Sequence, residues 1–500
     1  MSKQTAIVLA VLAVLIGATV AADRVLAAPS APQPTFSDDI DVDSGTWYCL
    51  PLAGRGQTAT LTVAAVGDAE SRITVQQVRR GQASVDGEPR DLAPNDSFEI
   101  EVAGRQRPTA VVVRWSGGPV AASWRAPTGD GDQLGASCAP SPAPRWLMTG
   151  ATTTVGSQAT VYLFNPFNTD AVANIAFATP EGRQDLVSSE NLSIPARDVL
   201  AVDVTELQPE QPDLGLIIEV DAGRLIASGI QEFGQPELPE VELEGAESVT
   251  DPSAPEGRTV LHAVAADATS AGFAYAAAGD ETTAWITVLN PNARPSTLEV
   301  TASDQIAGTS EEIVVGPESV ERIDLSAISS SPDFGVTVRS VNEVSFIAQE
   351  FVALTGDAKS VTSAPGVTEA DSVNVQAVAP DDAAAELAVF NPGDATAVAS
   401  VAVSGDEPDE WAVVELPAGA MQPLPFADVD VDGGAPVTVT ADEPVIATLR
   451  LGLDGERDAG LLTLPLTPQN TWSGSATAPV PVRDRTLETR PVDFPVQPEG

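Results

Sequence analysis

The sequence predicts an all-β protein with about four tandem immunoglobulin-like β-sandwich units, placed after an N-terminal apolar export or anchor helix. The first observation is a repeated strand ending, in which an apolar run stops at Asn165-Pro166, Asn290-Pro291 and Asn391-Pro392. Proline offers no N–H to a sheet ladder, and asparagine can close a turn through its own side chain. The second observation is a series of short runs with alternating apolar residues, separated by turns that draw on 39 glycines and 41 prolines. Together these patterns indicate a repeated unit of short strands.

The N-terminus carries Lys3 and then an unbroken apolar run over residues 6–22. At helical rise this run is roughly 25 Å long, between a typical export segment and a full membrane span. Residues 1–28 are therefore predicted to be a signal peptide or an N-terminal membrane anchor, and both alternatives stay open. Lys3 favours an N-terminus inside, so the remaining chain is expected to be extracytoplasmic, either membrane-anchored or secreted. Residues 29–44 are Pro-rich and then acidic, as in a tether.

The first sandwich unit is predicted over residues 45–140. Alternating runs such as 58–63 and 71–75 mark its strands. The only two cysteines, Cys49 and Cys138, lie at its start and its end. In an exported protein such a pair is expected to form a disulfide, which stabilises a loop of this length by roughly 4–5 kcal/mol. Two buried free thiols are the alternative.

Three further units are predicted, over residues 141–234, 258–366 and 367–470, and residues 471–500 are expected to be a flexible Pro-rich tail. Residues 235–257 are acidic and Pro-rich, which is typical of a linker. The Asn-Pro pairs support this division, because they lie 125 residues apart across the linker and 101 apart without it. The closing strands also correspond, because residues 231–233 and 349–351 both have the sequence Gln-Glu-Phe.

Composition excludes several functions. A formal charge of −46 with no basic cluster argues against nucleic acid as a partner. The single histidine, His262, is the only histidine a Ser-His-Asp triad could use, and no Gly-x-Ser-x-Gly elbow is present. The glycine-rich stretch 129–135 has the wrong spacing for a dinucleotide loop. We therefore expect no enzyme, no catalytic residue and no cofactor.

One acidic run has the spacing of a calcium loop. Asp428, Asp430 and Asp432 precede a glycine as in the first half of such a loop, but position twelve is Val439 instead of glutamate. These residues are a candidate metal site, with a solvated loop between strands as the simpler interpretation.

Tryptophans concentrate in and just after the first unit. Trp115 and Trp124 are candidates for stacking on the apolar faces of a sugar, and core packing is the alternative.

The export segment, the start Trp47-Tyr48-Cys49, the Pro-rich joint 138–146 and the Asn-Pro strands resemble a family of actinobacterial secreted or membrane-anchored envelope proteins. The family is known only as a domain of unknown function. The resemblance implies an envelope location and gives no catalytic residue. We expect a non-enzymatic spacer or interaction scaffold whose partner is an envelope protein or cell-wall polysaccharide. The alternative is an array of carbohydrate-binding modules acting through the first unit, and a hydrolase using acidic residues is a third possibility.

Overall fold

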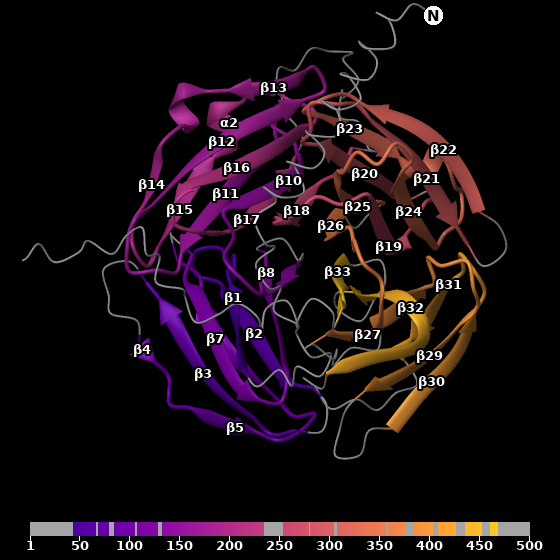
Figure 1. The fold of residues 1–500 in the computed structure, drawn as a ribbon, viewed down its shortest axis with the longest axis horizontal. Coiled ribbons are helices and arrows are strands. Elements are labelled where there is room, and N and C mark those ends of the chain that lie inside the picture. The colour runs from indigo at the N-terminus through magenta and orange to yellow at the C-terminus, as the bar shows by residue number, and fades with distance from the viewer. Residues whose placement is uncertain are drawn as a thin grey trace, which may run out of the picture. The chain divides into compact units, whose positions relative to one another are not determined.

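The computed structural model describes most residues between 44 and 468 (Figure 1). The described ranges are 44–66, 69–79, 85–105, 108–128, 133–234, 254–279, 281–304, 308–356, 359–376, 385–403, 409–426, 436–452 and 461–468. The apolar segment 6–22, the tether before residue 44, most of the linker and the tail from residue 471 lie outside them. All described residues belong to one compact unit, Val42–Gly500.

The prediction of an all-β fold is confirmed: the described residues form seven antiparallel sheets that pair into sandwiches. The helical elements within the described ranges are short: α2 (Val204–Leu207) and the 3-10 turns η1 (Val187–Ser189) and η2 (Leu325–Ala327). No helix in the described ranges is long and apolar enough to cross a membrane.

In the first sandwich one sheet contains β1 (Ser44–Cys49), β7 (Ala110–Gly117), β3 (Ser71–Val78), β4 (Val85–Asp86) and β5 (Arg90–Leu92). The facing sheet has the order β6 (Ser97–Ala103), β2 (Thr58–Ala65), β8 (Val120–Pro127) and β9 (Gln133–Ser137).

The second sandwich repeats this order with β10 (Arg145–Ala151), β16 (Leu214–Ala222), β12 (Ala171–Thr179), β13 (Gly182–Asp185) and β14 (Leu192–Ile194). Its facing sheet contains β15 (Asp198–Asp203), β11 (Gln158–Asn165), β17 (Ile226–Phe233) and β18 (Gly257–Leu261).

In the third sandwich the first sheet contains β19 (Ser270–Ala276), β24 (Phe334–Ser340), β21 (Ser296–Ser303) and β22 (Gly308–Val315). The second contains β23 (Ser319–Asp324), β20 (Thr282–Asn290), β25 (Ile347–Thr355) and β26 (Lys359–Pro365).

The fourth sandwich is one eight-stranded sheet, because the long strand β32 (Val437–Gly452) takes part in both halves. One half contains β30 (Asp409–Leu416), β29 (Ala397–Val403), β27 (Asp371–Gln376) and β34 (Thr467–Pro468). The other contains β31 (Met421–Pro425), β28 (Ala385–Phe390) and β33 (Leu461–Pro465).

The Asn-Pro motif ends the same strand in three sandwiches: β11, β20 and β28. Asn165, Asn290 and Asn391 are all fully buried. In each case the side-chain oxygen accepts a hydrogen bond of 3.0 Å from the backbone N–H two residues later. The amide nitrogen donates to the carbonyl four residues later, at 2.7–2.8 Å, and to a carbonyl about 25 to 29 residues further along the chain. The asparagine therefore closes the turn and ties it to the second half of its own sandwich.

Strand β18 begins at Gly257 and pairs with β17 over Gly229↔Leu261 to Phe233↔Gly257. Residues 258–261, expected at the start of the third unit, therefore complete a sheet of the second sandwich. The acidic linker is an insertion between two paired strands. The linker still explains why the first two Asn-Pro pairs lie 125 residues apart and the next two only 101.

The apparent match between the two Gln-Glu-Phe sequences does not hold in the sheet register. Ile226 and Ile347 are the equivalent positions, because each pairs with the residue before the Asn-Pro asparagine. Gln231 lies five residues after the first of these and Gln349 two residues after the second. The offset is three residues, and an odd offset places the side chains on opposite faces of a sheet.

The closing strands of the four sandwiches contact one another in a cycle, since β18 contacts β9 and β26, and β33 contacts β26 and β9. Figure 1 shows β18, β26 and β33 converging toward the middle of the view. The apolar cores are also continuous across unit boundaries. One core joins the first two sandwiches and extends to Trp285 and Phe351 of the third, and another joins Phe273 of the third to Phe390 of the fourth.

Candidate functional site

The four segments that follow the closing strands turn back and pair with the first strand of their own sandwich. Ala139 pairs with Tyr48, Val264 with Leu147 and Val367 with Gly272, and β34 pairs with β27. Residues from all four segments line one cavity of about 430 Å³: 138–141, 262–266, 365–369 and 465–468. The cavity is therefore a product of the repeat, built from the same part of every sandwich.

Aromatic side chains form one wall of this cavity. Trp47, Tyr48, Trp124 and Trp146 all contribute to it. The Trp47 indole N–H donates to the Val120 carbonyl at 2.6 Å, and the Trp146 indole N–H donates to a backbone carbonyl at 2.8 Å. Because these donors are used within the protein, the rings offer mainly apolar surface to the cavity.

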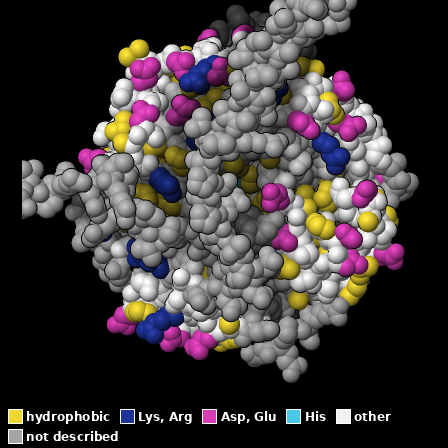
Figure 2. All heavy atoms as spheres, in the orientation of Figure 1, with side chains coloured by type: hydrophobic (Ala, Val, Ile, Leu, Met, Phe, Trp, Pro, Cys, Tyr) yellow, Lys and Arg dark blue, Asp and Glu magenta, His cyan; other side chains and the backbone are white. Residues whose placement is uncertain are grey.

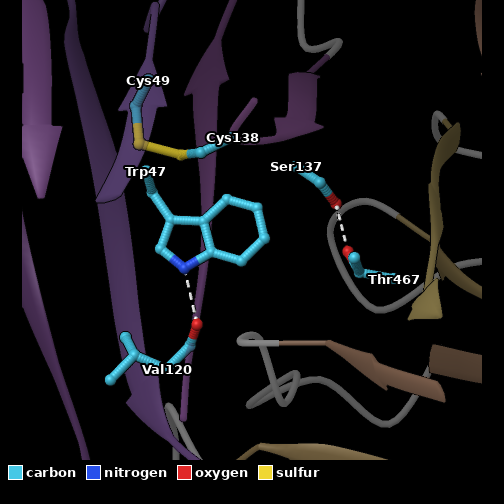
Figure 3. The surroundings of a disulfide bond; sticks show 6 residues. All are labelled: Trp47, Cys49, Val120, Ser137, Cys138 and Thr467. Carbon is cyan, nitrogen blue, oxygen red and sulfur yellow. Dashed lines mark hydrogen bonds between the residues drawn. A yellow bond between two sulfur atoms is a disulfide. The ribbon is translucent and has the colours of Figure 1, made fainter. Parts of the chain in front are cut away.

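The predicted disulfide lies at the edge of the cavity. Cys49 at the end of β1 is bonded to Cys138, just after β9, with the Cα atoms 4.5 Å apart (Figure 3). The bond fixes the returning segment of the first sandwich to its first strand. Next to it, Ser137 and Thr467 approach with their hydroxyl oxygens 3.5 Å apart, so the first and fourth sandwiches touch here.

Sequence comparison identifies the family. The model described as "Family of unknown function (DUF5719)" matches residues 120–285 and again residues 265–490. The chain belongs to the DUF5719 family. The second match begins directly after Val264. This residue ends the second sandwich by pairing with Leu147 of β10. The resemblance to a family of unknown function is thereby confirmed.

Comparison with curated proteins gives no match. Among solved structures, an α-L-rhamnosidase of Streptomyces avermitilis complexed with L-rhamnose is 10% identical over 79% of this chain, with a TM-score of 0.12. The chain spans 55% of that protein's length, and the likeness is too low to carry an argument.

His262 of this DUF5719 chain is partly buried at the cavity wall. Its Nε2 lies 3.2 Å from the Ser363 carbonyl oxygen, so this nitrogen carries the proton and donates it. Burial lowers the pKa of the imidazole to about 4, and the hydrogen bond to the Ser363 carbonyl opposes this by raising the pKa. The ring is neutral at physiological pH and is fixed between the second and third sandwiches.

A second buried polar cluster lies in the third sandwich, facing the fourth. Burial raises the pKa of Glu350 well above its usual value, and its Oε1 has no hydrogen-bond partner among the described residues. Burial also raises the pKa of the nearby Tyr275 phenol. The Arg450 guanidinium lies 4.7 Å from the centre of the Tyr275 ring and 3.8 Å from Asp333 Oδ1. These groups hold two sandwiches together and do not open onto the main cavity.

The other predicted site residues have different outcomes. Trp115 is only 4% exposed and packs over Gly45, away from the cavity. Trp124 is 2% exposed and lies on the cavity wall, so stacking on a sugar stays a prediction for this residue alone. Asp428, Asp430 and Asp432 lie outside the described residues. Within the described ranges no group of three or more His, Cys, Asp or Glu side chains is placed to hold a metal.

Sequence reasoning missed the cavity, because its lining comes from four short segments that follow one another at intervals of roughly 100 residues. One signal was available. Each segment follows the last alternating run of its unit and contains proline or small residues, as in Pro140, Ala263, Pro365 and Pro465.

Proposed function

We propose that this protein is a non-enzymatic extracytoplasmic scaffold of the cell envelope, which binds its partners on a body of four mutually packed sandwiches. The disulfide supports the compartment, because such bonds persist in oxidising surroundings. The apolar N-terminal segment supports delivery across the membrane, by cleavage or as an anchor.

The contact between the first and fourth sandwiches favours a scaffold over an extended spacer. Ser137 and Thr467 meet, and a Cβ atom on Gly135 would lie 3.2 Å from the Leu462 side chain. An extended spacer needs sandwiches that contact only their neighbours along the chain. A body whose ends touch instead presents several faces at fixed relative positions, which favours a role in gathering partners.

The state of His262 supports a non-enzymatic role. A general base must accept a proton near neutral pH, and burial has moved the imidazole pKa far below that range. Its one hydrogen-bonding contact through Nε2 is to a backbone carbonyl, where a nucleophile would need to be.

Recognition of cell-wall polysaccharide through the first sandwich is the second candidate. The observation in its favour is the aromatic wall of the cavity, to which Trp124 contributes. Since Trp124 is almost completely covered, a sugar would have to displace the covering segments to stack on it.

Retention on washed cell envelopes tests the proposal. The purified full chain should be retained reversibly, without change in the size of any envelope polymer, and treatment of the envelopes with protease or with polysaccharide-extracting agents should identify the class of partner. Progressive release of fragments from the polymer would contradict a non-enzymatic role. Retention no greater than that of an unrelated acidic sandwich protein would contradict the scaffold.

A further inference from the structure

We propose that a cleft between the first and second sandwiches binds the anionic groups, phosphate or carboxylate, of an envelope polysaccharide. The proposal rests on the scaffold function above and names one class of partner for it. The cleft is separate from the central cavity and has a volume of about 280 Å³.

Charge is distributed unevenly along the chain. Residues 45–140 contain nine arginines and ten acidic residues, so the first sandwich is almost neutral. The whole chain has a formal charge of −46, which the remaining units therefore carry nearly alone. A polyanion is repelled by most of this molecule, and the first sandwich is where it can approach. Figure 2 shows several basic side chains over the first two sandwiches, on the left of the view.

Three arginines line the cleft: Arg55 and Arg105 from the first sandwich and Arg258 from β18 of the second. Glu232 is the one acidic residue among the described lining residues. Its carboxylate is already engaged, because Arg258 Nη2 lies 2.8 Å from Glu232 Oε2. Arg55 and Arg105 form no ion pair with another described residue. The described lining of the cleft therefore has an excess of positive charge.

The backbone holds the Arg55 and Arg105 loops together. The Gly56 N–H donates to the Gly104 carbonyl at 3.4 Å, and the Gly104 N–H donates to the Gln57 carbonyl at 2.8 Å. The approach is so close that a Cβ atom on Gly104 would lie 2.1 Å from the Gly54 carbonyl oxygen. The two loops that carry Arg55 and Arg105 are therefore adjacent, so both guanidinium groups can contact one anion in the cleft.

Uncharged donors complete the lining. Burial raises the pKa of Tyr162, with Arg258 opposing and Asp203 adding to the shift, so its hydroxyl stays protonated and can donate. Gln57 uses its side-chain oxygen to accept from the Gly54 N–H at 3.0 Å, which leaves its amide N–H groups as donors. Gln158 and Thr160 also line the cleft. Guanidinium groups beside amides and hydroxyls suit a polymer that carries both anionic groups and sugar hydroxyls.

Binding of the full chain to polygalacturonate and to poly(glycerol phosphate) tests the proposal, with dextran as a neutral control. We expect binding to at least one polyanion that weakens as salt rises, and none to dextran. The double variant Arg55→Gln/Arg105→Gln should lose about tenfold or more in affinity. The two polyanions distinguish carboxylate from phosphate as the group recognised.

The matched control is Arg72→Gln/Arg114→Gln, which removes two charges from the exposed surface of the same sandwich outside the cleft. It should bind within about twofold of the wild type, because removing remote surface charge changes little at moderate salt. Equal losses in both variants, equal binding to dextran, or no binding to either polyanion would overturn the proposal. Envelope retention of the same proteins separates the two ideas: if wild type is retained but binds neither polyanion, the cleft proposal fails and the scaffold stands.

Discussion

At the scale of single residues, a buried asparagine amide fixes the turn after the same strand in three of the four sandwiches. Proline alone would end the strand, but it would leave the turn free to move. The asparagine side chain satisfies one backbone donor and at least two backbone acceptors at zero exposure, so the turn and the facing sheet are fixed together. A buried amide of this kind cannot be replaced without leaving backbone groups unpaired.

Asn391→Ala is expected to destabilise the fourth sandwich by roughly 2–4 kcal/mol, because several buried hydrogen bonds are lost at once. Urea unfolding followed by circular dichroism measures the change. Asn174→Ala is the control, since the Asn174 amide donates to Asp221 at the exposed surface. A loss for Asn391→Ala no larger than for the control would show that the amide does not hold the turn.

The buried Glu350 predicts a pH-dependent stability difference. Its folded pKa is raised above the unfolded value, so its contribution is fully present below about pH 4.5 and is lost as pH rises through the folded pKa. Glu350→Gln keeps the shape and cannot ionise. The melting temperature of the variant minus that of wild type should therefore increase between pH 4.5 and pH 8. A difference that is constant with pH would mean that Glu350 does not remain protonated on folding.

The contribution of His262 to stability depends on pH in the opposite direction from that of Glu350. Its folded pKa is lowered to about 4, so its contribution is present above the unfolded value of 6.5 and is lost as pH falls toward 4. The pKa difference corresponds to roughly 3 kcal/mol. The advantage of wild type over His262→Gln should therefore shrink as pH falls from 7 to 5, measured by thermal unfolding. An advantage that grows in that interval would contradict a neutral buried imidazole.

At the scale of elements, neighbouring sandwiches interlock through glycines. A Cβ atom on Gly150 would lie 2.2 Å from the Phe351 ring, one on Gly335 would lie 2.4 Å from the Phe390 ring, and one on Gly272 would lie 2.3 Å from Ile446. Each contact joins two adjacent sandwiches. A large apolar side chain of one sandwich occupies the space that a glycine leaves in the other, which allows the sheets to approach closely.

Gly335→Ala should destabilise the protein by roughly 1–3 kcal/mol, because the buried Phe390 ring is rigid and has no room to move. Calorimetry should show the loss together with earlier separation of the third and fourth sandwiches. Gly279→Ala serves as the control, since nothing lies within 4 Å of a Cβ atom there. Equal melting temperatures for Gly335→Ala and the wild type would indicate that this contact is loose.

The junction of the second and third sandwiches adds an aromatic group. Trp285 and Phe351 stack with ring centres 5.2 Å apart, and Phe233 of the second sandwich meets both rings edge-on. Arg322 lies 4.3 Å from the Trp285 ring centre on this junction. The Gln349 side chain also bridges the two sandwiches. Its oxygen accepts a hydrogen bond from the backbone N–H of His262 at 3.1 Å, and its nitrogen donates to the Val260 carbonyl at 2.9 Å. Polar and apolar contacts together make this boundary continuous with the sandwich cores.

At the scale of the whole molecule, contact between the first and fourth sandwiches predicts a specific cross-link. The two thiols of Gly135→Cys/Leu462→Cys should be joined by a short bifunctional maleimide reagent, seen as a band of altered mobility on a reducing gel. The native Cys49–Cys138 bond is already closed and leaves no described free thiol to compete. Each single variant is a control. Failure of the double variant to cross-link, while it folds normally, would contradict the contact.

Sequence patterns predicted the strands and the sandwich units, and they did not predict how the sandwiches pack against one another. The alternating runs 58–63 and 71–75 are strands β2 and β3 in the structure, because strand period is a local property. The Gln-Glu-Phe match failed because similarity of three letters does not fix the register of a sheet. Trp115 packs in the core, which was the alternative to sugar stacking, and its neighbour Gly45 lies 70 residues earlier in the chain, so no local pattern decides between the two. The cavity and the arginine cleft arise from packing between sandwiches, which no local pattern encodes.

Strand β32 gives the fourth sandwich a property that the other three lack. Elsewhere a short turn separates the strand of one sheet from the next strand of the facing sheet, whereas here one backbone of 16 residues serves both ladders. Opening either half must strain the same chain segment, so the two halves should lose protection against amide deuterium exchange together. The fourth sandwich should then unfold as one cooperative unit, without an intermediate in which only one sheet has opened.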